Sequence, residues 1–571
     1  MWGGETLRLL PELAAAGLRG AATPFRVWWR RNWIYRSFLK GPLADHIVFH
    51  PWDATPRRLE EADGLLRGRF RFHGTFVDVP EGVSVFDLPP PTQAWHMALH
   101  SFAWLPALSN AGGDNARKLA TNLIGQWVKR YGAYSEPIWL AHIMARRLAA
   151  IFSHGRLVIL NSEMTWRSRL FVSLREQSRL LERISREAPD GLPRLEAAAV
   201  LALSSLCLDD TFKRRETGLK RLQEEIERQI LPDGGHISRS PEELLTAYRH
   251  VVMVMESLSA MGEEPPHALR NAHDRMAPML RFFRHADGGM ALFNDGSEGD
   301  PRMIAGLLAR DDVRGQPFHH ARHSGYQRLT AGRTLVLLDC GKTPEGAFAL
   351  SAHAGAAAFE MSSGHDRIVV NCGAAGLDHQ AWSAALRATA AHSTLILCDT
   401  STAHILPAGL VRDLLGPRLM GGPIAPVSRR VETAQGWSAE TMHDAYVAPF
   451  GLRHERQITL SPQGLMVTGR DRLAPVSPKT GPERATSGLN FAVRFHIHPD
   501  VRVSRLEGGG ILLKLPGGEG WRFRAGGGIL DVEESVYLGG PMVRRAEQLV
   551  VSGTTKGAST EIAWVFEQIV A

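Results

Sequence analysis

Two ionisable side chains stand on a short turn between two predicted helices, and their chemistry suits proton transfer and carboxylate binding. Residues 229–241 read Gln-Ile-Leu-Pro-Asp-Gly-Gly-His-Ile-Ser-Arg-Ser-Pro: a helix ends, a glycine turn follows and a new helix begins. His236 can transfer a proton near neutral pH. The guanidinium fork of Arg239 matches the two oxygens of a carboxylate. The alternative for His236 is a helix cap or a solvent-exposed group.

Tyr248 lies on the helix that is predicted after this turn, and its hydroxyl can act as an acid or a base. Neighbouring residues with helical spacing favour a different interpretation, in which Tyr248 belongs to an apolar stripe in the core. His250 lies about 200° around the helix from Tyr248, so the two side chains cannot share one face. The apolar neighbours are Leu244, Leu245, Val251, Val252 and Met255.

The elements that must position these side chains change in character along the chain. From about residue 90 to 310, apolar residues recur every three or four positions, as in Leu219, Leu222 and Ile226, which predicts amphipathic helices. Such helices bury their stripes on one another in a bundle or a toroid of helix pairs. From about residue 325, short β-branched runs alternate with glycine-rich turns, which predicts an antiparallel sandwich or barrel.

Composition excludes several classes of protein. The 571 residues include 66 Lys and Arg and 59 Asp and Glu, and this net charge of +7 is too dilute for a nucleic-acid-binding face. The four cysteines form no CxxC pair, so a disulfide scaffold and a zinc ribbon are not expected. No apolar run is long enough for a transmembrane segment. Charged residues and a proline interrupt the N-terminal apolar stretch, so no secretory signal is expected.

A second group of motifs follows the helical half. It comprises Ser-Ala-His-Ala-Gly at 351–355, Phe-Glu at 359–360, Val-Val-Asn-Cys-Gly at 369–373 and Arg-Ala-Thr-Ala-Ala-His-Ser-Thr at 387–394. Together with the 229–241 turn, these motifs resemble the heparinase II/III-like polysaccharide lyases. The resemblance implies an N-terminal incomplete (α/α) toroid, a C-terminal antiparallel β-sandwich and a cleft between them. It also implies cleavage of an acidic, uronate-containing polysaccharide by β-elimination.

β-Elimination requires a neutralised uronate carboxylate, a base for the C5 proton and an acid for the leaving oxygen. The resemblance implies an Asn-His pair, a Tyr and a His for these tasks. This sequence has Leu192 and Pro193 at the pair, Glu243 at the Tyr and Ser351 at the His. The candidates to replace them are Tyr248, His236 and His392 for proton transfer, and Arg239, Arg387 and Trp139 for substrate binding.

The resemblance further implies a zinc site at His353, Asn371 and His392. Two imidazoles and a carboxylate would suit zinc, but the family carboxylate is here the neutral amide of Asn371. The alternative is a hydrogen-bonded polar cluster that shapes the cleft. Arg387, five residues before His392, can support either arrangement. Zinc is the one cofactor that the resemblance suggests.

The first 75 residues combine aromatic and basic side chains. One interpretation is a contact with a membrane surface or a nucleic acid. The favoured one is that the aromatic rings dock this arm onto the helical domain while the arginines reach water. The residues concerned are Trp28, Trp29, Trp33 and Tyr35, and Arg26, Arg30, Arg31 and Arg36.

The sequence thus predicts an N-terminal arm at 1–80, a toroid at 81–315 and a β-sandwich at 316–571. Two functions stay open: a polysaccharide lyase, and a catalytically degenerate member of the family that binds or guides an acidic envelope polysaccharide. The expected partner is an acidic polysaccharide or oligosaccharide, with no nucleic acid. The resemblance places the protein in the cell envelope or periplasm, and the cytoplasm is the alternative. The oligomeric state and the glycan are not determined.

Overall fold

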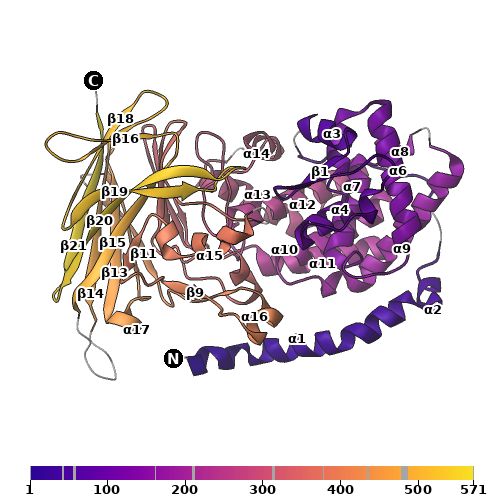
Figure 1. Ribbon diagram of the computed structural model, residues 1–571, viewed down its shortest axis with the longest axis horizontal. Coiled ribbons are helices and arrows are strands. Elements are labelled where there is room, and N and C mark those ends of the chain that lie inside the picture. Colours follow the sequence, from indigo (N-terminus) through magenta and orange to yellow (C-terminus); the bar gives the residue numbers. More distant parts are fainter. Residues whose placement is uncertain are drawn as a thin grey trace. The chain divides into compact units, whose positions relative to one another are not determined.

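The computed structural model describes residues 2–41, 44–55, 59–160, 162–208, 212–311, 315–376, 379–433, 436–476 and 486–569. They divide into two compact units, which we call unit 1 (residues 1–229 and 246–273) and unit 2 (residues 230–245 and 274–571). Helices come first and antiparallel strands follow, as predicted (Figure 1). The domain bounds at 80 and 315 stay predictions.

Unit 1 is built from packed helices and one small hairpin. Its central helix, α10, consists almost wholly of small and aliphatic residues, is buried from Leu195 to Cys207 and packs against α7 and α11. A Cβ at Gly218 of α11 would lie 2.8 Å from the Cα of Ala202, so this close helix approach requires glycine. The elements are α1 (Trp2–Arg31), α2 (Trp33–Ser37), α3 (Leu59–Leu66), β1 (Arg69–Phe72), β2 (Thr75–Asp78), α4 (Gln93–His100), α5 (Leu105–Ala111), α6 (Gly113–Tyr131), α7 (Ala141–His154), α8 (Arg156–Ile159), α9 (Met164–Ile184), α10 (Leu192–Cys207) and α11 (Phe212–Gln229). The helices α12 (Pro241–Ala260) and α13 (His267–Phe283) continue the series.

Unit 2 contains two antiparallel sheets. One has the strand order β11-β12-β13-β14-β21-β18-β17-β16, and the other β19-β20-β15-β7-β6-β5-β4-β3, with β8 paired to β15. The strands of the second sheet are β3 (His320–Ala321), β4 (Tyr326–Ala331), β5 (Thr334–Asp339), β6 (Phe359–Ser363), β7 (Asp366–Val370), β8 (Leu395–Leu397), β15 (Ser487–Ile497), β19 (Ile529–Tyr537) and β20 (Arg544–Lys556). Those of the first are β11 (Val427–Thr433), β12 (Gly436–His443), β13 (Leu452–Leu460), β14 (Met466–Pro475), β16 (Arg502–Arg505), β17 (Ile511–Lys514), β18 (Gly520–Gly526) and β21 (Thr560–Ile569). Short elements fill the connections: α14 (Pro301–Leu308), α15 (Ser383–Leu386), β9 (Ala403–Ile405), α16 (Leu410–Leu415), β10 (Leu419–Gly421) and α17 (Val447–Phe450).

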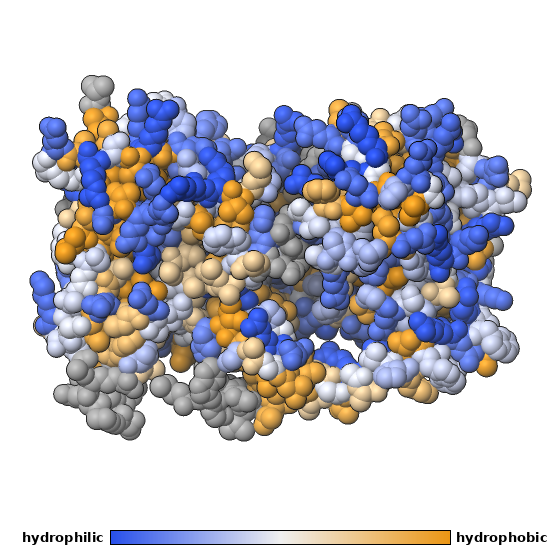
Figure 2. All heavy atoms as spheres, viewed as in Figure 1, coloured by the Kyte–Doolittle hydropathy of each residue, from blue (hydrophilic) through white to orange (hydrophobic). Residues whose placement is uncertain are grey.

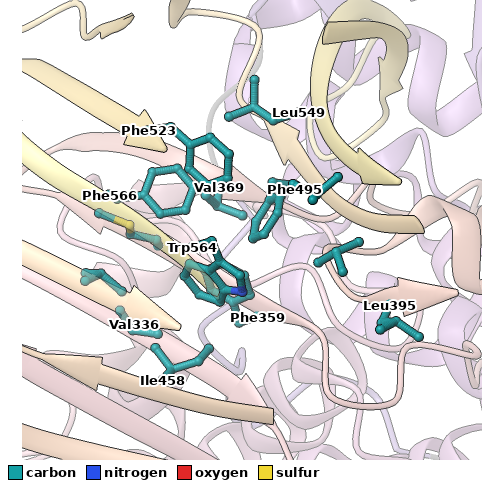
Figure 3. Packing of buried hydrophobic residues seen from close by; sticks show 14 of the residues in the cluster. Val336, Phe359, Val369, Leu395, Ile458, Phe495, Phe523, Leu549, Trp564 and Phe566 are labelled. Carbon is teal, nitrogen blue, oxygen red and sulfur yellow. The ribbon is translucent and has the colours of Figure 1, made fainter. Parts of the chain in front are cut away.

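The core of unit 2 lies between these sheets and is rich in aromatic rings (Figure 3). Phe359 of β6 stacks on Trp564 of β21, with ring centroids 5.3 Å apart and planes at 12°. A Cβ at Gly469 would come within 1.9 Å of the Trp564 ring, so β14 needs glycine where it passes under the indole. Side chains from both sheets meet in one cluster, which confirms the predicted sandwich.

The N-terminal helices dock only in part as the favoured prediction has it, since Tyr35 is buried and its ring centroid lies 5.5 Å from the guanidinium of Arg183. Arg30 donates to the hydroxyl of Tyr134 over 3.1 Å and pairs with Glu187 over 2.5 Å. Trp28 and Trp33 are exposed. The docking of this arm through these two indoles is therefore wrong, because the arginine finds a carboxylate and a hydroxyl on unit 1 instead. None of the described helices has the length and apolar content needed to cross a bilayer.

Candidate functional site

The turn at 230–240 is fixed by Asp233 and Gly234. The Asp233 carboxylate accepts hydrogen bonds from the backbone N and the Oγ of Ser324, each over 2.7 Å. Gly234 has φ +85°, and a Cβ at this position would lie 2.0 Å from the carbonyl oxygen of Arg275. Only glycine fits at this close approach to Arg275, and the bonds of Asp233 to Ser324 hold the turn against the segment that precedes β4.

Arg239 uses its guanidinium inside the protein. It forms an ion pair with Asp339, donates to the carbonyls of Ser324 over 2.8 Å and Lys342 over 2.9 Å, and lies 4.7 Å from the Tyr326 ring centroid. Burial lowers the pKa of Arg239, but the Asp339 carboxylate outweighs burial and the net pKa is raised. Arg239 therefore stays charged and holds the turn against β4 and β5 of unit 2.

Glu243 and Ser351 occupy the positions at which the resemblance implies a Tyr and a His. The Ser351 Oγ donates a hydrogen bond to Glu243 Oε1 over 2.7 Å. The other carboxylate oxygen lies 3.3 Å from His236 Nδ1, which is 2.7 Å from the Oγ of Ser238. Glu243 thus bridges the predicted candidate His236 and Ser351, which lies in the segment before β6. Its carboxylate can accept hydrogen bonds but replaces a phenol that would donate a proton.

Asn294 links this turn to the histidines and was missing from the predicted site. Its Oδ1 accepts a hydrogen bond from the backbone N of His353 over 3.0 Å. Its Nδ2 donates to the hydroxyl of Tyr326 over 2.9 Å, and that hydroxyl donates to the carbonyl of Arg239 over 2.8 Å. The signal in the sequence is Asn-Asp-Gly at 294–296, since Asn294 has the left-handed φ of 48° that this motif tolerates.

His353 and His392 contact each other as a buried pair. His353 Nδ1 lies 3.2 Å from His392 Nε2, and the rings are nearly perpendicular at 82°. His392 Nδ1 lies 2.9 Å from the carbonyl of Ala388, which makes it the protonated nitrogen. Burial and the neighbouring His353 hold the pKa of His392 well below 6.5, so His392 is neutral at pH 7. His353 Nε2 is buried and lies 3.8 Å from Asp295 Oδ1.

Asn371 does not complete a metal site with these two imidazoles. Its Oδ1 accepts from the backbone N of Ser393 over 3.1 Å, and its Nδ2 donates to Glu360 Oε1 over 3.1 Å. Among the described residues, no group of three His, Cys, Asp or Glu side chains has the arrangement of a metal site. The donor set does not fit zinc, because the usual protein ligands of zinc are Cys, His and carboxylate groups and Asn371 offers a neutral amide. The side chains form a hydrogen-bonded polar cluster.

Arg387, the other predicted arginine, also bonds within unit 2. It donates to the carbonyls of Ala352 over 2.9 Å, Ala349 over 3.0 Å and Pro417 over 2.5 Å. These bonds tie the segment before His392 to the segment that carries His353. The guanidinium therefore positions the histidine pair and has its donors engaged with the backbone.

Acidic side chains gather beside Glu243. The Glu242 carboxyl accepts from Ser297 Oγ over 2.7 Å. Burial raises the pKa of Glu242, and the nearby charges of Asp295 and Glu243 raise it further. Asp295 and Glu243 are partly exposed, at 38% and 22% of their side-chain areas. The accessible part of the site is therefore acidic, which disfavours a polyanion.

Two further candidates belong to unit 1 and are parts of its interior. Tyr248 is fully buried, and its hydroxyl lies 3.0 Å from His273 Nε2 with the two rings stacked. Trp139 is buried, donates to the carbonyl of Tyr131 over 2.9 Å and stacks on Trp127. Both are core side chains. For Tyr248 this is the alternative that its apolar neighbours in the sequence favoured.

The fold and the family match define the class of this chain. Residues 313–565 match the family described as heparinase II/III-like, C-terminal, and the chain belongs to the heparinase II/III-like polysaccharide lyase family. The chain is also 30% identical over 546 residues to FtsZ-localized protein C of Caulobacter vibrioides (strain NA1000 / CB15N), which covers 94% of this chain and 93% of that protein.

Solved structures of lyases share the fold at low sequence identity. Heparinase III has a TM-score of 0.70 at 14% identity, over 100% of this chain and 92% of that chain. A mutant of the heparan sulfate lyase HepC from Pedobacter heparinus has a TM-score of 0.62 at 16% identity, over the same shares of the two chains. These likenesses confirm the predicted fold class, a helical toroid followed by a β-sandwich.

Proposed function

We propose that this chain binds a glycan through the partly exposed carboxylates beside Ser351 and does not cleave it by β-elimination. The observation that carries the proposal is the hydrogen bond of 2.7 Å between Ser351 and Glu243. It joins the two positions at which the resemblance implies proton-transfer residues. A hydroxyl and a carboxylate that satisfy each other offer neither a phenol nor an imidazole for the elimination step.

The remaining candidates support the same proposal. The neutralisation of a uronate carboxylate needs a free cation or amide. Arg239 is paired with Asp339, and the donors of Arg387 are engaged with carbonyl oxygens. His392 has a depressed pKa because of burial, and both of its nitrogens have partners. No described candidate combines accessibility with a free donor, so binding without elimination is favoured over lyase activity.

The charge of the site favours a particular kind of sugar. Glu243 and Asp295 present carboxylates, and Glu242 lies beside them. Hydroxyl and amide groups of neutral sugars donate well to carboxylates, and an ammonium group does so with charge assistance. We therefore propose a neutral or amino sugar at Glu243 in place of the acidic sugar expected from the family.

A two-part assay tests this proposal. Heparan sulfate and other uronate polymers are incubated with the protein, and the ultraviolet absorbance of the unsaturated product is followed. Binding of chitin, chitosan and heparan sulfate fragments is measured by calorimetry. We expect no absorbance change, and binding of chitosan or chitin fragments that Glu243→Gln weakens at least about tenfold, whereas the exposed Glu507→Gln leaves it unchanged. An unsaturated product from any polymer, or binding of heparan sulfate alone, would contradict the proposal.

We infer a second role from the relative that matches over nearly the whole length. Its name states that it is localized with FtsZ, and the alignment covers 94% of this chain. We propose association with FtsZ as an alternative to glycan binding in the envelope or periplasm. Co-sedimentation of the purified chain with FtsZ from the same organism tests this, with the FtsZ-free protein as the control; a chain that stays in the supernatant in both samples would end the inference.

The cell envelope or periplasm stays our proposal for the location of glycan binding, with the cytoplasm as the alternative. Fusions of the full chain to a reporter that is active only after export, and to one that is active only before export, distinguish the two. An export-dependent signal supports the envelope, and its absence supports the cytoplasm.

A further inference from the structure

The helix α1 exposes a continuous apolar stripe. Leu10 is 52% exposed, Leu18 73%, Phe25 67% and Trp28 58%. At 100° per residue these four side chains lie within an arc of about 80° on one side of the helix. Trp29, 37% exposed, extends the arc to about 100°. An amphipathic helix of a globular protein normally turns such a stripe toward the core.

Another side of α1 holds the helix to unit 1. Arg26 and Arg30 lie on a separate arc, at about 80° and 120° on the wheel that places Leu18 at 0°. Arg26 lies 3.6 Å from Glu187, Arg30 pairs with the same carboxylate, and Arg31 donates to the carbonyl of Tyr134 over 3.2 Å. The exposed side chains of the stripe therefore point away from these contacts, and apolar atoms are exposed where α1 lies in Figure 2.

Charge is concentrated in the same segment. Residues 1–40 contain seven Lys and Arg but only two Glu, a net of +5, whereas the whole chain carries +7. Tryptophan and phenylalanine at the edge of an apolar stripe, beside arginines, are the residues that favour the boundary between lipid headgroups and acyl chains. The thirty residues of α1 would extend about 45 Å along such a surface.

We propose that α1 binds the surface of an anionic lipid bilayer, with Leu10, Leu18, Phe25 and Trp28 inserted at the level of the headgroups and the exposed Arg19, which flanks the stripe, near the phosphates. The helix lies on the membrane and does not cross it. Unit 1 is tethered through the arginine contacts of α1, so the rest of the protein is held at the membrane. The inference does not depend on glycan binding.

Flotation of the full-length protein with lipid vesicles tests this proposal. The vesicles contain phosphatidylcholine and phosphatidylglycerol in equal parts, and pure phosphatidylcholine vesicles provide the uncharged comparison. We expect the protein to float with the anionic vesicles and less with the neutral ones. The triple variant Leu18→Gln, Phe25→Gln and Trp28→Gln should lose at least about tenfold in partitioning, since it removes three inserted apolar side chains.

A matched control uses exposed apolar residues elsewhere. The triple variant Ile424→Gln, Ile529→Gln and Met542→Gln changes unit 2 side chains of similar exposure and should float like the original protein. Circular dichroism checks that both variants fold. Protein that stays unbound on anionic vesicles, or an α1 variant that floats equally well, would overturn the proposal. A dimer seen by light scattering and dissolved by the α1 variant, without vesicle binding, would assign the stripe to a second copy and overturn it too.

Discussion

The hydroxyl of Ser351 and the carboxylate of Glu243 hydrogen-bond to each other over 2.7 Å, although 108 positions separate them in the chain. The family resemblance implies a His and a Tyr at these positions. The two residues present form a matched donor and acceptor. The pair joins the turn to the segment of unit 2 that carries Ser351.

This pairing predicts an energetic coupling. Ser351→Ala and Glu243→Ala should each destabilise unit 2, because a partly buried charge-assisted hydrogen bond is worth about 1–3 kcal/mol. Their double variant should be more stable than the sum of the single effects predicts, by about 1 kcal/mol. Urea denaturation of the three variants measures the coupling. The control cycle combines Ser297→Ala with Glu243→Ala. Ser297 donates to Glu242 rather than to Glu243, so the losses of unfolding free energy in this cycle should be additive. Equal coupling in both cycles would contradict a specific bond between Ser351 and Glu243.

Arg239 gives a prediction that separates structure from ligand binding. Arg239→Ala removes the partner of the buried Asp339, and an unpaired buried carboxylate costs about 3–5 kcal/mol of unfolding free energy. Asp339→Asn added to Arg239→Ala should recover part of this loss. Chemical denaturation measures both. Unchanged stability together with weakened glycan binding would instead establish Arg239 as the carboxylate clamp that the sequence suggests.

Unit 1 should lose stability in acid because of Glu196. Burial raises the pKa of this carboxyl, but Arg146 at 2.7 Å and His250 outweigh burial and lower it from 4.5 to about 2. The group therefore stabilises the folded state fully above pH 4.5, and the contribution disappears as the pH falls toward 2. Its size is about 3 kcal/mol.

The measurement is thermal unfolding between neutral pH and the acid limit. Glu196→Gln should lower the neutral-pH stability and flatten the acid dependence. The exposed Glu216→Gln on α11 serves as the control and should keep the dependence of the original protein. A Glu196→Gln profile with an unchanged acid slope would show that other carboxylates cause it.

The polar cluster around Asn371 predicts that zinc does not stabilise the fold. The purified protein should contain less than about a tenth of an equivalent of zinc, and a chelator should leave the unfolding temperature unchanged. Asn371→Asp should destabilise unit 2, because the new carboxylate would lie beside Glu360 Oε1, now 3.1 Å from the amide nitrogen. Elemental analysis and calorimetry check both; stoichiometric zinc in the original protein would refute the interpretation.

Local periodicity was enough to predict a helical half followed by a half of antiparallel strands. The three-and-four spacing around Leu222 and the short runs of the second half indicate burial on one face, which leaves a bundle or a toroid open for the helices and a sandwich or a barrel for the strands. The family resemblance implied the toroid and the sandwich. Motif order likewise indicated the family, and the motifs alone identify Glu243 and Ser351 as departures from its pattern. These properties depend on neighbours in the chain, which a sequence displays directly.

Partners distant in sequence could not be predicted in this way. Arg239 has a side chain suited to a substrate carboxylate, but whether it meets a ligand or Asp339 depends on how β5 approaches the turn. The same holds for α1, whose residues show an amphipathic pattern without showing which face turns outward. Tertiary structure decided both cases. Folding brings the Asp339 carboxylate within reach of Arg239, so the guanidinium pairs inside the protein. Folding likewise brings Glu187 within reach of Arg30, so the arginine side of α1 contacts unit 1 and the apolar side is left exposed.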